Sequence, residues 1–119
     1  MAARGFVDFG KCPYVTAQKL LDGKWSILIL HYLNDFGPMR FSEIQRKMPN
    51  VTHATLSSQL KLLETQGLIH REVFPEVPPR VEYSLTEIGR EFSPVLACIG
   101  EWGSKYIDYM KDHPEYVLG

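Results

Sequence analysis

The chain carries a cluster of polar side chains that could hydrogen-bond to a charged partner: Thr52, His53, Thr55, Ser57, Ser58, Gln59 and Lys61. Hydroxyl, amide and imidazole groups match the donors and acceptors of base edges in the DNA major groove, and a lysine matches a phosphate. His53, Thr55 and Ser58 are expected at base edges. Gln59 is expected at an adenine or a phosphate, and Lys61 at a phosphate. The alternative is an ordinary solvated helix face.

The sequence around this cluster predicts a helix-turn-helix over residues 42–66, after a short extended piece, and its second helix would present the cluster. Ser42 and Gln45 have the spacing of a capping box at the start of the first helix. Pro49 follows the end of that helix, and Thr52 caps the second one. The second helix has one apolar stripe, which consists of Leu56, Leu60, Leu63 and the flanking Ala54.

A β-hairpin, called the wing below, is predicted over residues 68–85, directly after the helix-ending Gly67. Its two strand-like runs are residues 68–74 and 80–85, and the second alternates apolar and polar side chains as a half-buried strand does. Between the runs, residues 75–79 contain three prolines, which lack the amide hydrogen that strand pairing needs. The tip of the wing should therefore be stiff and unpaired.

Basic residues on and near the wing are expected to contact DNA phosphates. Arg71 and Arg80 flank the wing tip, and Lys24, Arg40 and Arg46 are weaker candidates. Residues 40–80 carry six basic and four acidic residues, whereas residues 81–119 carry three basic and seven acidic ones. A basic middle and an acidic end fit a polyanion-binding face opposite an oligomerisation element. The alternative is a set of surface charges without a specific role.

Two further helices are predicted over residues 12–35, after an N-terminal arm at residues 1–11 that shows no periodicity. Cys12-Pro13 marks the start of the first helix, because proline is favoured in the first turn. The second helix, within residues 24–34, is strongly apolar and is expected at the centre of the core, with a strand as the weaker alternative. These helices would support the fold and contribute to a dimer.

A long terminal helix is predicted over residues 86–112, capped by Thr86 and kinked or restarted at Pro94. An apolar seam with a seven-residue repeat follows it: Ile88, Phe92, Val95, Ile99, Trp102, Tyr106 and Tyr109, widened by Leu96, Gly103 and Met110. A helix of roughly 25 residues spans about 37 Å. The radius of gyration expected for a chain of this length is only about 14 Å. Part of the seam should therefore lie outside its own domain and pair with a second copy.

Several short motifs occur together along the chain. They are Cys12-Pro13, Gly23-Lys24-Trp25, Arg40-Phe41-Ser42-Glu43-Ile44, Gly67-Leu68-Ile69, Glu101-Trp102 and, most specific of all, the wing segment PEVPPRVEYSLT at residues 75–86. Over roughly residues 12–110, this pattern closely resembles the HxlR family of bacterial transcription regulators. The resemblance implies a MarR-like, homodimeric winged helix-turn-helix that binds an operator palindrome and represses or activates adjacent genes. The chain departs from the family pattern at Ala54, where members often carry a lysine.

Cys12 is a candidate redox sensor. At a helix N-terminus the helix dipole stabilises a thiolate, and Lys11 adds a positive charge beside it. The resemblance implies the same role, because the cysteine at this position senses oxidants or electrophiles in several family members. The alternative is a partly buried, inert thiol. Cys98, in the terminal helix, is expected to be a packing residue.

The expected fold class is mainly α with a small β-hairpin, as one domain of 119 residues with dimerisation helices at both ends. No apolar run is long enough to span a membrane and no secretory segment is recognised, so a cytoplasmic protein is expected. The two cysteines have neither a metal nor a disulfide pattern. No metal site, cofactor or enzyme activity is expected, because the four histidines lack ligand partners at suitable spacing and no nucleophile–base pair appears.

Two further readings of function stay open. A winged helix could serve protein–protein assembly without specific DNA binding, which the missing cation at Ala54 and the net charge of −1 favour slightly. A small-molecule effector could also bind at the dimer interface, lined by Trp25, Trp102 or Tyr106. The simpler explanation of these three aromatic side chains is that they fill the core.

Overall fold

The computed structural model describes residues 8–116 of the chain. The predicted arm, residues 1–11, therefore lies mostly outside the described residues, and only its end, residues 8–11, is seen as a turn. The first described helix, α2 (Pro13–Leu20), begins after Cys12, as predicted. Pro13 is well placed in this first turn, because the amide hydrogen that it lacks would have no partner within the helix.

The centre of the core is α3 (Ser26–Phe36), as the apolar sequence predicts. Ile29, Leu30 and Leu33 are at most 2% exposed, and they belong to one apolar cluster with leucines from the helix-turn-helix. Burial of each such side chain stabilises the fold by about 1.5–3 kcal/mol. The helix α3 therefore provides the central apolar surface against which the other elements pack.

The helix-turn-helix consists of α4 (Phe41–Lys47) and α5 (His53–Thr65). The predicted cap at Ser42 is wrong, because α4 begins at Phe41 and its cap is Arg40, two residues earlier than predicted. The Glu43 carboxylate accepts a hydrogen bond from the Arg40 amide at 2.8 Å. Gln45 does not complete a capping box. Its side-chain amide donates to the Val51 carbonyl at 2.6 Å and so fastens the turn between the two helices.

The start of α5 is as predicted. Thr52 Oγ1 accepts a hydrogen bond from the Thr55 amide at 3.1 Å, which satisfies one of the amides that a helix start leaves unpaired. The helix is followed by Gly67, whose φ of 78° lies in the left-handed region that favours glycine. Leu56, Leu60 and Leu63 are at most 1% exposed and attach α5 to the core.

One predicted core position on α5 is wrong. Ala54 is exposed, although it was grouped with the buried leucines. Residues two apart in an α-helix differ by about 200° around the axis. Ala54 precedes Leu56 by two residues, so it points away from the core. Ala54 therefore belongs to the outer face of the helix.

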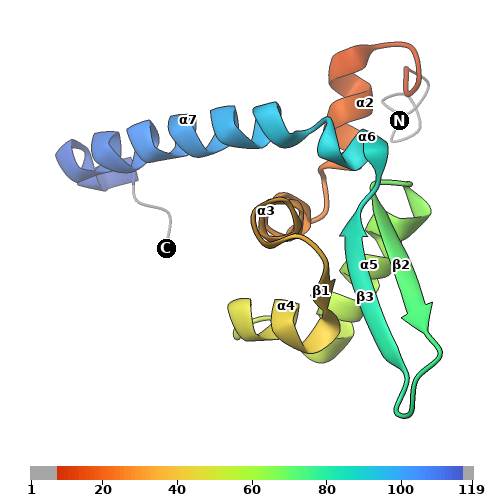
Figure 1. Ribbon diagram of the computed structural model, residues 1–119. Helices are drawn as coiled ribbons and strands as arrows, with labels where there is room; N and C mark the ends of the chain where they lie inside the picture. The colour runs from red at the N-terminus through yellow and green to blue at the C-terminus, as the bar shows by residue number, and fades with distance from the viewer. Residues whose placement is uncertain (1–7, 117–119) are drawn as a thin grey trace.

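A three-stranded antiparallel sheet, in the order β1-β3-β2, adjoins the helix-turn-helix (Figure 1). Its strands are β1 (Met39–Arg40), β2 (Ile69–Phe74) and β3 (Arg80–Leu85). The hairpin of β2 and β3 confirms the predicted wing, and its outermost pair is Phe74 with Arg80. The short extended piece before α4 is β1, which adds a third strand by pairing Met39 with Tyr83.

The predicted terminal helix is broken into α6 (Glu87–Arg90) and α7 (Ser93–Asp112), followed by the short 3-10 helix η1 (Pro114–Tyr116). Thr86 caps α6 and Pro94 lies in the first turn of α7, so the predicted cap and restart are confirmed. The 20 residues of α7 span about 30 Å. Figure 1 shows this helix projecting from the rest of the molecule, which agrees with the radius of gyration of 16.5 Å.

Candidate nucleic-acid interface

The outer face of α5 is a continuous exposed surface. Ala54, Ser58 and Lys61 are spaced by four and three residues, so they form one row along the side opposite the buried leucines. This set is called the outward row below. Thr55 and Ser57 flank it, and all five residues are exposed. Within residues 8–116, Lys61 has no ion pair, so its charge is available to a partner.

The first turn of α5 directs a hydroxyl group outward. Thr52 Oγ1 accepts from the Thr55 amide and donates to Thr55 Oγ1 at 2.9 Å. Thr52 is therefore occupied by the cap, whereas the Thr55 hydroxyl keeps its own hydrogen for a base or a phosphate. The remaining free amides and the positive end of the helix dipole also favour an anion at this end.

His53 is held against the preceding helix. Its ring centroid lies 4.4 Å from that of Phe41, the first residue of α4. Phe41 is half-buried and packs against the core. Its ring therefore supports the core-facing side of the exposed His53 imidazole and fixes its orientation. The contact joins both helices of the motif, and it depends on tertiary packing that the sequence pattern did not reveal.

Gln59 does not take the outward position predicted for it. Its Oε1 atom is buried and has no hydrogen-bond partner among the described residues. This atom lies 2.7 Å from the place that a Cβ would occupy on Gly23, and Ser26 Oγ lies 2.4 Å from the same place. Gly23 thus allows the turn before α3 to approach α5 closely. The structure turns the Gln59 amide toward that turn, away from the exposed outer face of α5.

Arg80 is enclosed by acidic side chains of the wing. Its guanidinium group pairs with Glu76 at 2.9 Å and with Glu82, and it lies over the ring of Phe74 at 3.9 Å. The hydrogen bonds that its guanidinium donates to the Glu76 carboxylate raise the pKa of Arg80 further above its ordinary value. Residues 69–85 carry three glutamates and two arginines. A phosphate would have to compete with two carboxylates, so this environment disfavours the predicted contact.

The other predicted phosphate contacts are spread over the molecule. Arg71 on β2, Arg40 before α4 and Arg46 near the end of α4 are exposed and have no ion pair within residues 8–116. Lys24 lines a groove together with Leu96 of α7.

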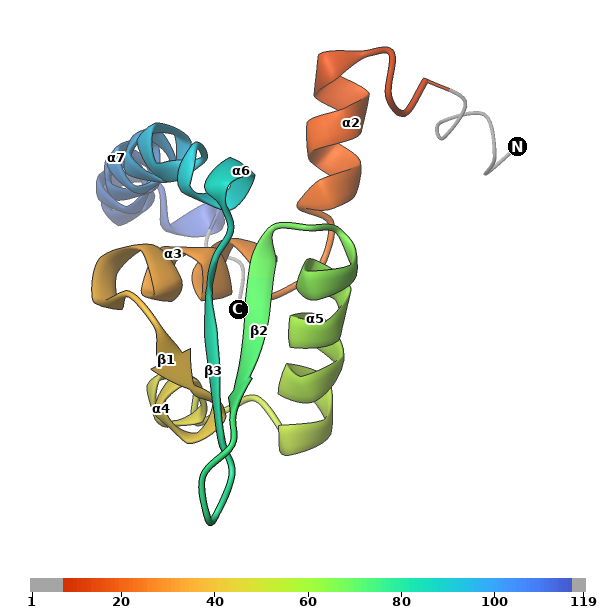
Figure 2. The same ribbon diagram turned by 45° about the vertical axis from the view of Figure 1, so that its right-hand side comes forward.

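Figure 2 shows that the first turn of α5 and the tip of the wing lie at the same end of the molecule. The other end is formed by α2 and α6. An exposed helix of about 20 Å in length, with a hairpin beside it, has the dimensions to enter a major groove while the hairpin reaches the adjacent backbone. Sequence reasoning placed these elements in the right order, but it missed the outward position of Ala54.

The predicted seam falls into two parts. Phe92 is half-buried and Leu96 is 7% exposed, so both pack against their own chain. Trp102, Tyr106 and Tyr109 are 65%, 37% and 43% exposed. Trp102 stacks on Tyr106 with ring centroids 5.5 Å apart. Trp102 and Tyr106 therefore do not fill the core of their own chain, which corrects the simpler explanation given to them.

The remaining seam residues vary in exposure. Ile88, on the separate helix α6, is 57% exposed and Val95 is 44% exposed. Ile99 and Met110 are half-buried. An exposed apolar row of this extent is typical of an interaction surface.

The two cysteines have different surroundings. Cys12 is half-buried at the start of α2, in an extended conformation with φ −89° and ψ 120°. Its carbonyl accepts a hydrogen bond from the Thr16 hydroxyl at 2.8 Å. Cys98 is exposed, so the prediction that it packs is wrong within this chain. The reason is its position two residues after the buried Leu96, which places it on the opposite side of α7.

Among residues 8–116, no three His, Cys, Asp or Glu side chains gather as a metal ion would require. None of the helices described there combines the length and apolar character needed to cross a membrane.

Two helices joined by a short turn, with an exposed second helix and an adjoining β-hairpin, define a winged helix-turn-helix protein. The HxlR-like helix-turn-helix family matches residues 20–111, and the chain belongs to this family. The predicted fold class and family are thus confirmed, and with them the assignment to DNA-binding transcription regulators. The match begins after Cys12, so it does not test the role of that residue.

Individual relatives agree with this assignment. The HTH-type transcriptional regulator YdeP of Bacillus subtilis is 46% identical over 101 residues, which cover 85% of this chain and 78% of YdeP. The redox regulator HypR in its reduced form superposes with a TM-score of 0.79 at 39% identity, covering 85% of this chain and 99% of that chain. The reduced form of the regulator YodB from B. subtilis gives 0.70 at 38% identity, covering 80% and 93%.

Proposed function

We propose that the protein works as a dimer that binds an operator palindrome and regulates an adjacent gene. The observation that carries the DNA contact is the outward row of α5, which is exposed and lies beside the wing at one end of the molecule. In this proposal the outward row enters the major groove. Thr55 and Ser58 hydrogen-bond to base edges, and Lys61 contacts a phosphate.

Ala54 and His53 take distinct parts in the contact. The Ala54 methyl group is the only apolar element of the outward row, and such groups recognise the methyl group of thymine. His53, supported by Phe41, faces the backbone at the positive end of the helix. Ser57 and the exposed Arg71 provide further polar contacts at the edges of the same surface.

The proposed dimer forms through the exposed end of α7. Trp102, Tyr106 and Tyr109 are large apolar groups that water would otherwise contact. Pairing of two copies would place two α5 helices in successive major grooves, about 34 Å apart on one side of the DNA. A palindromic operator then matches the two-fold symmetry of the protein.

Footprinting on DNA from upstream of its own gene and its neighbours tests this proposal. The expected result is protection of two half-sites one helical turn apart, together with a dimer in solution by analytical ultracentrifugation. The rival role in protein–protein assembly is supported by the acid-rich wing, in which Arg80 is already paired. A dimer that protects no site in this DNA, and that binds it no more tightly than random DNA, would refute the proposal in favour of that rival.

A redox response through Cys12 is proposed with it. The thiol lies half-buried at a helix start, and Lys11 is the preceding residue. Diamide should reduce operator binding by the wild-type protein and by Cys98→Ser, but not by Cys12→Ser. Cys98→Ser is a matched control, because this second thiol is the more exposed one. A Cys12→Ser protein that loses operator binding on oxidation as wild type does would refute the assignment.

A further inference from the structure

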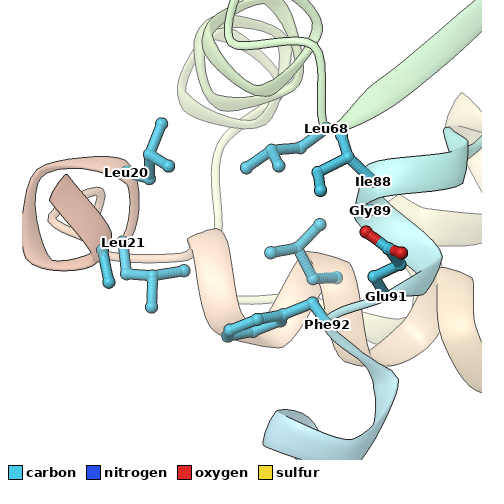
Figure 3. A pocket seen from close by; sticks show the side chains of 9 residues that line it. Leu20, Leu21, Leu68, Ile88, Gly89, Glu91 and Phe92 are labelled. Atoms are coloured by element: carbon cyan, nitrogen blue, oxygen red, sulfur yellow. The ribbon is translucent and has the colours of Figure 1, made fainter. Parts of the chain in front are cut away.

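An apolar cavity of about 220 Å³ opens between α2, α3 and α6 (Figure 3). Figure 3 shows Leu20, the last residue of α2, and the following Leu21 facing Leu68 and Ile88 across it, with the ring of Phe92 directed toward Leu21. Two of the elements that line it, α2 and α6, lie at the end of the molecule away from the wing tip (Figure 2). It is therefore separate from the proposed DNA contacts.

The size and lining of this cavity suit a small organic group. A cavity of roughly 150 Å³ lined by leucine, isoleucine and phenylalanine stays dry and binds benzene. The present cavity is larger and has a similar apolar lining, but it is open to solvent beside Ala17, Ile88 and Glu91, so it has room for a phenyl or branched alkyl group with a polar end in water. Ala17, an exposed residue of α2, also lines the cavity, and its small side chain leaves the α2 side of the cavity open.

The polar end of the ligand is indicated by Glu91. Among the described lining residues, Glu91 is the only charged one, and its carboxylate has no hydrogen bond or ion pair within residues 8–116. The neighbouring Arg90 forms no ion pair with it, and its guanidinium is directed to the Leu85 carbonyl, to which it donates at 3.0 Å. Glu87, one turn earlier on the same helix, adds a second negative charge nearby. An apolar cavity with an acidic rim complements an apolar cation.

We propose that this cavity binds a small organic cation, with its apolar group between α2 and α6 and its ammonium group beside Glu91. Binding can be linked to α5 through Leu68, which follows the helix-ending Gly67. The Leu68 carbonyl accepts a hydrogen bond from the Thr86 amide at 3.1 Å, and an added Cβ on Gly89 would lie only 2.2 Å from this oxygen. An effect of the ligand on operator affinity rests on the proposed function, whereas the binding itself does not.

Three probes with one apolar body test the class of ligand: phenethylamine, 2-phenylethanol and phenylacetate. Calorimetric titration of the full chain measures the affinity of each probe, and the methyl NMR signals of Leu20 and Ile88 show whether the probe binds in the cavity. The affinity should be highest for the amine and lowest for the acid. Glu91→Gln should weaken amine binding about two- to fivefold, the range of an exposed ion pair, and leave the alcohol unchanged. Glu101→Gln removes the same charge from α7 and should change neither.

Ala17→Leu tests the location, because a longer side chain would fill the cavity from an exposed helix position without disturbing the core. It should abolish saturable binding of all three probes. Equal affinity for amine and acid, unchanged binding by Ala17→Leu, or no saturable binding at all would each overturn the proposal. A second copy that seats its own side chains between α2 and α6 in the dimer would overturn it too, since the partner would then occupy the cavity. If the protein binds operator DNA but no amine, the ligand proposal is refuted and the proposed DNA-binding function still stands.

Discussion

Changing the charge of the outward row in both directions tests whether this surface contacts DNA. Lys61→Ala removes a lysine that has no ion pair among the described residues. Ala54→Lys adds one on the same row, two turns earlier. Both positions are exposed and outside the core, so Lys61→Ala should change the free energy of unfolding by no more than about 0.5 kcal/mol. Ala54→Lys should cost about 0.3–1 kcal/mol, because a cation near a helix N-terminus opposes the dipole.

The expected size of the DNA effect follows from counterion release. Each phosphate contact contributes about −0.9 to the slope of log K against log salt concentration. A dimer carries two copies, so Lys61→Ala should reduce the magnitude of the slope by about 1.8. Over a threefold increase in salt, this changes the ratio of wild-type to variant affinity about sevenfold. Ala54→Lys should steepen the slope by a similar amount.

Fluorescence anisotropy with the footprinted operator and a scrambled duplex, at several salt concentrations, measures these slopes. Ala54→Lys should raise affinity for the scrambled duplex more than for the operator, because it replaces the methyl group proposed to contact thymine. Lys111→Ala is the control, since it removes an equally charged side chain, 72% exposed, from the far end of α7. Slopes that stay the same for both outward-row variants would show that α5 does not meet the phosphate backbone.

Two further predictions concern the wing and the glycines. Arg80→Gln should leave the salt slope unchanged, unlike Lys61→Ala, because Arg80 already pairs with two glutamates; a slope reduced by about 1.8 would show that Arg80 leaves these partners for DNA. Gly89→Ala should destabilise the fold by about 1–3 kcal/mol, measured by urea unfolding, because the methyl group would lie 2.2 Å from the Leu68 carbonyl oxygen. Gly23→Ala should cost less, since the atoms it meets belong to side chains that can rotate; an equal or greater loss would refute this distinction.

Local chemistry explains which parts of the fold could be predicted from the sequence. Thr52 and Thr86 precede helices because their hydroxyl groups pair with the amides three residues later. Gly67 follows a helix because its backbone takes a positive φ. Pro94 interrupts the terminal helix because it cannot donate the hydrogen bond that a helix interior requires. Each of these caps and breaks depends on residues only a few positions apart, so it can be predicted without knowledge of the tertiary structure.

The errors arose where a residue depends on its distant neighbours or on its angle around a helix. The spacing of Ser42 and Gln45 predicts a cap at Ser42, but β1 pairs with β3 and the chain enters α4 already after Arg40. The polar side chain of Gln59 suggests a DNA contact, but Gly23 lacks a side chain and leaves space that the Gln59 amide fills. The position of Ala54 was predictable, because a count of 100° per residue from Leu56 places it outside.

The dimer seam can be tested by a substitution that stabilises the helix and weakens the interface. Gly103 lies one residue after Trp102 and about 60° around α7 from Tyr106, at the border of the exposed aromatic row. A methyl group added there would meet no other part of the described chain within 4 Å. In an isolated copy, Gly103→Ala should therefore stabilise the helix by about 0.5–1 kcal/mol.

In a dimer that packs along the aromatic row, the same methyl group would enter the interface. The dissociation constant should then rise at least fivefold, because overpacking costs about 1–3 kcal/mol. Gly100→Ala is the matched control: it gains the same helix propensity in equally open space, but it lies about 200° from Trp102 and should leave dimerisation unchanged. Sedimentation equilibrium and thermal unfolding separate the two effects. If Gly103→Ala raised the melting temperature without weakening the dimer, the seam would not be the surface on which two copies meet.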